Sequence, residues 1–135
     1  MKRNFVRGGV FVLAVLVALI VLSEHIHFWS DKGYYDDLVR LASQMEISPG
    51  QGKSFDYKDG QLLPNSRGSI GVRAPQEGVF VIDVDQSGGH LGVQGKIYAS
   101  DGLLKTIVDS GAVYAEVMAF RRLSSNWWFY NNAQD

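Results

Sequence analysis

Two aspartates that alternate along the chain are the residues most suggestive of metal chemistry. The stretch "FVIDVDQSGG" opens like a calcium-binding EF-hand loop, because Asp83, Asp85 and Ser87 alternate before a glycine. Such a loop also requires an aliphatic residue at its eighth position and a glutamate at its twelfth, where this chain has His90 and Gln94. The same letters are typical of two strands joined by a glycine turn, with both aspartates on the solvent face. We therefore predict a hairpin and no metal site, and cation binding by Asp83 and Asp85 stays an open alternative.

Other catalytic motifs are incomplete. The stretch "GQGKS" resembles the end of a phosphate-binding loop, but Ile47 occupies the position of its first glycine. His25 and His27 adjoin the apolar N-terminal segment, which leaves one histidine in the rest of the chain, and no Gly-x-Ser-x-Gly motif is present. Glu116 lies among apolar residues that would suit an acid or base, but pairing with a cross-strand cation such as Lys96 explains it better. We predict no enzyme activity, no catalytic residue and no cofactor.

The last strands of the predicted sheet carry large aromatic, methionine and charged side chains. In strand alternation these fall on the face away from the main core, and such residues are enriched in protein interfaces. We predict an interaction surface that comprises Tyr98, Tyr114, Glu116, Met118, Phe120, Arg122, Trp127 and Trp128. The alternative is that a helix at residues 34–45 or the loop at residues 48–67 covers this face and makes it a second core.

Hydrophobic periodicity predicts an α+β fold for the part of the chain that carries these residues. An amphipathic helix is expected from about residue 31 to the "SPG" stop, with an apolar stripe of Tyr34, Leu38, Leu41 and Met45. Residues 48–67 are loop-like. Beyond them the period changes to two, which predicts a meander of about five antiparallel strands packed on the helix, interrupted by a short helix or crossover at residues 100–111.

Length and charge limit the function classes. A chain of 135 residues with an apolar N-terminal segment has room for one small folded domain. Lys and Arg number 13 and Asp and Glu 14, for a net charge of -1, so nucleic acid is not an expected partner. No cysteine is present, which excludes disulfides and thiolate metal sites.

The N-terminus is predicted to be a membrane segment. The cationic stretch "MKRNFVR" precedes "GGVFVLAVLVALIVL", which has no polar side chain, and acidic residues follow. By the positive-inside rule the N-terminus stays in the cytoplasm and the remainder is exported to the periplasm or the cell exterior. This predicts an anchor or signal peptide at residues 1–29 and an exported domain at residues 30–135.

The segment is long enough to be retained in the bilayer. Residues 8–29 would span it if Arg7 extends toward the headgroups and Phe28 and Trp29 form an interfacial aromatic belt. The alternative is cleavage after Ser23, which has a residue type that signal peptidase accepts.

Two functions follow from these features. The first is a membrane-tethered, non-enzymatic interaction or assembly subunit, whose exported domain binds a partner protein or forms a homo-oligomer. The alternative is a cleaved periplasmic or secreted domain that binds a small ligand between its helix and its sheet.

Overall fold

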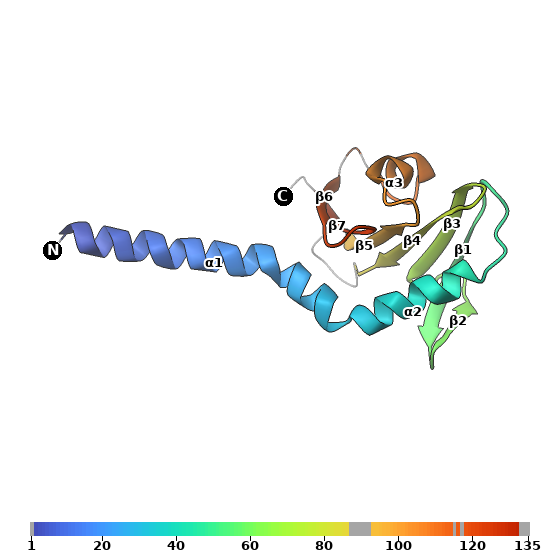
Figure 1. Ribbon diagram of the computed structural model, residues 1–135, viewed down its shortest axis with the longest axis horizontal. Helices are drawn as coiled ribbons and strands as arrows, with labels where there is room; N and C mark the ends of the chain where they lie inside the picture. Colours follow the sequence, from blue (N-terminus) through green and yellow to red (C-terminus); the bar gives the residue numbers. More distant parts are fainter. Residues whose placement is uncertain (1, 87–92, 115, 117, 133–135) are drawn as a thin grey trace. The chain divides into compact units, whose positions relative to one another are not determined.

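The computed structural model describes residues 2–86, 93–114, 116 and 118–132, which form three helices and a seven-stranded sheet (Figure 1). The chain divides into two compact units, Met1–Gly33 and Tyr34–Asp135. The first unit is helical, and the second contains every strand of the described residues.

Helix α1 (Lys2–Ser30) contains the apolar N-terminal segment. Its stretch Arg7–Ser30 has 24 residues and contains an 18-residue window with a mean hydropathy of 2.4, so it is long and apolar enough to cross a membrane. At 1.5 Å per residue it extends about 36 Å, against about 30 Å for a bilayer core. A signal sequence has the same character, so the helix is compatible with either retention or cleavage.

Helix α2 (Lys32–Ser43) follows a break at Asp31 and is amphipathic, as the sequence predicted. Its buried residues are Tyr35, Leu38 and Ala42, whereas the predicted stripe residues Tyr34 and Leu41 are half-buried at its edge. Both neighbouring tyrosines fit helical spacing with Leu38, so periodicity does not distinguish them. Packing against the sheet selects Tyr35.

The sheet is antiparallel throughout, with strand order β2-β1-β3-β4-β5-β7-β6. Its strands are β1 (Gly52–Lys58), β2 (Gln61–Pro64), β3 (Ile70–Gln76), β4 (Val79–Asp85), β5 (Gln94–Ala99), β6 (Met118–Arg122) and β7 (Trp127–Asn132). The α+β class is confirmed, but the prediction of a five-stranded meander is wrong. Strand β7 lies between β5 and β6, because its first four residues are all buried, while β6 exposes Ala119, Arg121 and Arg122 and takes the edge.

The two strands that the sequence prediction missed lie in the stretch assigned to a loop. Strand β1 buries only Phe55, and β2 buries no residue, so neither shows a clear apolar alternation. They are joined at Asp59 and Gly60, which have φ angles of 51° and 73° and form the two-residue turn typical of hairpins. Pro64 is tolerated because β2 is an edge strand.

Each face of the sheet packs against one helix. On one face lie Ile70, Val72, Ile82 and Val84, together with the buried side of α2. On the other face a cluster of Val81, Ile97, Ala99, Trp128 and Tyr130 surrounds Ile107 of α3 (Leu104–Ser110). Burying Ile107 completely stabilises the fold by about 1.5 to 3 kcal/mol. Helix α3 ends at Gly111, whose φ of 67° is the left-handed conformation of a glycine cap.

Candidate functional site

The eight predicted interaction residues do not form one surface. Tyr98 and Trp127 are cross-strand partners on the face that α2 covers. The opposite face, that of α3, carries Met118, Phe120, Arg122 and Trp128. Tyr114 and Glu116 precede β6 and are exposed. Successive residues of a strand point to opposite sides, so the two tryptophans of β7 separate the set between the faces.

The α2 face holds a continuous row of six aromatic rings. In order these are Tyr57, Tyr34, Tyr35, Trp127, Tyr98 and Phe80, with neighbouring ring centroids between 5.0 and 5.5 Å apart. Three of the five neighbouring pairs meet edge to face, the geometry that aromatic quadrupoles favour, and the other two are tilted. Burial raises the pKa of the Tyr98 phenol. Tyr98 and Trp127 therefore pack in a second core under α2, the alternative to an exposed interaction surface.

A buried lysine lies beside this row. Lys96 is 5% exposed, and its Nζ donates a hydrogen bond to Oε1 of Gln86 at 3.1 Å. The same ammonium lies 5.4 Å from the ring centroid of Tyr35. Lys96 thus faces α2, away from the Met118 and Phe120 side that Glu116 was predicted to share.

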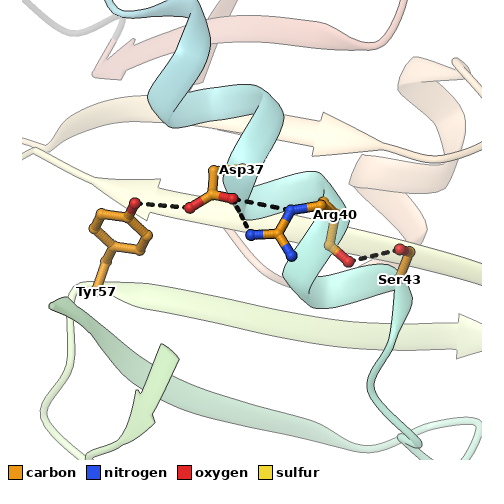
Figure 2. Close-up of polar contacts among 4 residues, drawn as sticks. All are labelled: Asp37, Arg40, Ser43 and Tyr57. Atoms are coloured by element: carbon orange, nitrogen blue, oxygen red, sulfur yellow. Dashed lines mark hydrogen bonds and ion pairs between the residues drawn. The ribbon is translucent and has the colours of Figure 1, made fainter. Parts of the chain in front are cut away.

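Polar contacts connect α2 to β1 at the end of the aromatic row (Figure 2). The hydroxyl of Tyr57 donates to Oδ2 of Asp37 at 2.7 Å, and Arg40 donates to Oδ1 and forms an ion pair with it. The Tyr57 hydrogen bond and then Arg40 lower the pKa of the Asp37 carboxyl, and the Asp37 contact raises the pKa of Tyr57. The contact stabilises the ionised form of Asp37 and the neutral form of Tyr57, so neither group is tuned to act as an acid or base. The cluster connects α2 to β1.

Exposed apolar side chains concentrate around α3. Six large apolar residues are exposed in the described part of the second unit, and four of them fall between positions 103 and 114. We call Leu103, Leu104, Val108 and Tyr114 the α3 surface. Leu104 and Val108 are one helical turn apart and share a face of the helix, and Tyr114 is 84% exposed.

A polar cavity of about 320 Å³ opens on the α3 side of the sheet, next to the end of that helix. Its lining comes from β1, the loop before β3, β3, β4 and the segment after α3, and comprises Gly52, Lys53, Ser54, Gly68, Ser69, Gly71, Arg73, Asp83, Asp85 and Ala112. Asp83 and Asp85 are thus on the face that the sequence predicted. Asp83, however, is half-buried and not solvent-facing, because it borders the apolar cluster under α3.

Asp83 is held by a buried tyrosine. The hydroxyl of Tyr130 donates to Oδ1 of Asp83 at 2.6 Å. Burial raises the pKa of Asp83 to about 6, a shift that the Tyr130 hydrogen bond opposes. Burial and the Asp83 charge also raise the pKa of Tyr130. The sequence prediction missed this pair, although the alternation of β7 places Tyr130 on the same face as Asp83.

A second cavity of about 280 Å³ lies between α2 and the β3–β4 hairpin, and its lining is of mixed polarity. Apolar residues such as Ala42, Met45 and Val72 line it together with polar ones such as Ser43 and Glu77. Its position between helix and sheet is the one expected for the alternative function of ligand binding.

Within the described ranges, no group of three or more histidine, aspartate or glutamate side chains is arranged to hold a metal ion. The calcium-loop positions Ser87 and His90 lie outside the described residues. The strands β4 and β5 on either side of them pair antiparallel, as the hairpin interpretation predicted.

The three residues predicted at the membrane interface all lie in α1. Arg7 is exposed near its N-terminal end. Near the other end the rings of Phe28 and Trp29 meet edge-on at 5.8 Å, and the Lys32 ammonium lies 5.7 Å from the Trp29 ring centroid. Arg7 and Trp29 are 22 residues apart, about 33 Å along a helix, which matches the separation of the two interfaces.

Comparison with known proteins returned no matching family model, curated protein or solved structure.

Proposed function

We propose that this chain is a membrane-tethered, non-enzymatic subunit whose exported domain binds a partner protein through the α3 surface. The observation that carries the proposal is the concentration of exposed apolar side chains at Leu103, Leu104, Val108 and Tyr114. Clustered apolar side chains on an otherwise polar domain are typical of a protein interface.

The surroundings of these side chains suit a partner protein. Lys105 and Asp109 lie on the same helix and form an exposed ion pair at 3.8 Å, which gives the apolar residues a polar margin. Tyr114 adds a large aromatic group of the kind that contributes most to binding energy. Tethering through α1 would keep the domain near other proteins of the same membrane and raise its effective concentration there.

Site-specific photocrosslinking in intact cells tests the proposal. A photoreactive residue at position 108 is expected to crosslink to a protein, whereas one at the exposed position of Lys58 on β1 serves as control. A crosslink to a second copy would make the partner a homo-oligomer. Crosslinks to lipid alone, or equal crosslinking from position 58, would contradict the proposal.

Matched leucine variants test the same surface by affinity. Leu104→Ser is expected to reduce recovery of the crosslinked partner about tenfold or more, because it removes a buried contact of the interface. Leu63→Ser is the control, since Leu63 is similarly exposed but lies on β2. Both changes are at exposed positions, so the domain should stay folded.

The cavity between α2 and the β3–β4 hairpin favours the second function, a released small-ligand-binding domain. That function requires cleavage after Ser23, so the mass of the protein in membranes and in the soluble exported fraction distinguishes the two.

A further inference from the structure

The floor of the polar cavity is formed by glycines and a serine, which place little or no side chain into it. Gly52 and Ser54 of β1 and Gly71 of β3 lie on the α3 face, where the neighbouring cluster has the larger side chains of Ile97 and Tyr130. Gly68 approaches β1 so closely that a Cβ there would lie 2.1 Å from the Phe55 carbonyl oxygen. Small residues therefore leave this part of the face open beside the packed cluster under α3.

Charges of both signs border the cavity. Asp83 and Asp85 project from β4 on the α3 face, and the stem of Arg73 passes over Gly52, since a Cβ at Gly52 would meet its Cγ at 2.8 Å. Arg73 is near enough to Asp83 to stabilise its ionised form. The lining is mainly polar and combines the acidic residues Asp83 and Asp85 with the basic residues Lys53 and Arg73.

The position of Asp83 is fixed by its neighbours. Gly95 is the Cα partner of Tyr130, and a Cβ there would lie 2.5 Å from the Tyr130 hydroxyl oxygen. The missing side chain lets the Tyr130 ring lie across β5 and donate to Oδ1 of Asp83. The carboxyl group is thereby oriented at the boundary between the apolar cluster and the cavity. Within the described part of the chain Oδ2 receives no hydrogen bond, so it can accept one from a ligand.

We propose that this cavity binds a small zwitterion, a free α-amino acid, with its ammonium group against Asp83 and Asp85 and its carboxylate toward Arg73. A hydrogen bond from an ammonium group to an oriented, half-buried carboxylate is strong because both groups are charged. A guanidinium group binds a carboxylate through two parallel hydrogen bonds. The volume of about 320 Å³ is in the range of small-molecule sites. The proposal uses a different face region from the α3 surface and is independent of the proposed function.

NMR titration of the full-length ¹⁵N-labelled protein in detergent micelles tests the proposal. The probes are individual free amino acids from each side-chain class, each paired with its N-acetyl derivative and its methyl ester. We expect the amides of Ser69, Gly71 and Ser54 to shift with at least one free amino acid. Loss of the ammonium or the carboxylate should weaken binding about tenfold or more.

Variants identify the groups that bind. Asp83→Asn should weaken binding of the free amino acid about tenfold or more. Arg73→Gln should mainly reduce the preference for the free amino acid over its methyl ester, because the ester lacks the carboxylate that Arg73 would bind. Glu77→Gln is the control, because Glu77 lines the cavity beside α2 and not this one. Arg73 is exposed, so Arg73→Gln keeps the test decisive if Asp83→Asn does not fold.

Three results would overturn the proposal. The first is the absence of cavity shifts with every free amino acid. The second is equal binding of the N-acetyl derivatives, which lack the ammonium group. The third is a response to CaCl₂ that EDTA reverses while amino acids produce none, which would make the two aspartates a cation site.

Discussion

At the scale of single residues, Asp83 has the most altered environment among the carboxyl groups described. It borders an apolar cluster, and burial raises its pKa from 3.8 to about 6. An acid with a raised pKa in the folded state binds its proton more tightly there than in the unfolded chain. Its contribution to stability is therefore full below about pH 4 and is lost as the pH rises through about 6.

This linkage predicts the pH dependence of the variant Asp83→Asn, which cannot titrate. Relative to the natural protein, the variant should gain about 2 to 3 kcal/mol of unfolding free energy between pH 4 and pH 7, because only the natural protein must ionise a half-buried carboxyl. Denaturant unfolding of the solubilised chain, followed by tryptophan fluorescence at several pH values, measures the difference. A difference that does not change with pH would show that Asp83 titrates normally.

The sequence predicted the side of the strand on which Asp83 lies, but not its burial. Alternation with Ile82 and Val84 decides the face and is a local property. Burial depends on Tyr130, which is 47 positions away, and on the glycine at position 95 that lets its ring approach. Such long-range packing leaves no periodic pattern near Asp83, so the candidate cavity was not predictable in this way.

At the scale of elements, α2 shows how packing selects one helical stripe from two that the sequence permits. Leu38 and Leu41 both belong to the predicted stripe. In the structure Leu38 is fully buried, and Leu41 is half-buried. Tyr35, one turn before Leu38, contacts Trp127 with ring centroids 5.0 Å apart.

A matched pair of substitutions tests this orientation. Leu38→Ala should reduce the unfolding free energy by about 2 to 5 kcal/mol, because it leaves a cavity between helix and sheet. Leu41→Ala removes the same atoms from the same helix but should cost about 1 kcal/mol, because its site is partly solvated already. Denaturant unfolding of both variants measures the two losses. Equal losses would mean that Leu38 and Leu41 contribute equally to the buried stripe, to which the sequence assigned both.

The strands illustrate a second limit of sequence patterns. Strand β3 alternates clearly between buried and more exposed residues and was predicted, whereas β1 and β2 bury too little to alternate. The order of β6 and β7 was also not predictable from their hairpin, because either strand can pair with β5. Burial of the aromatic residues of β7 decides it. The alternation of side chains along β7, and not the strand order, divides the predicted interaction residues between two faces.

At the scale of the whole molecule, the fate of α1 determines which proposed function applies. If the helix is retained, its cationic start holds the N-terminus in the cytoplasm and the domain stays tethered. If it is cleaved after Ser23, the domain is released and the α3 surface loses the advantage of proximity to membrane partners. The two products differ by the first 23 residues, so the mass of the protein distinguishes them.

We predict that the full-length chain remains in membranes after a carbonate wash. Burying about 20 apolar residues in the bilayer outweighs the cost of extending Arg7 to the headgroups, so alkaline extraction should not release it. Intact-mass measurement of the washed membranes and of the soluble exported fraction tests this. Full-length mass in the membranes supports the tethered subunit, whereas a soluble species that begins at Glu24 would contradict tethering and favour the released ligand-binding domain.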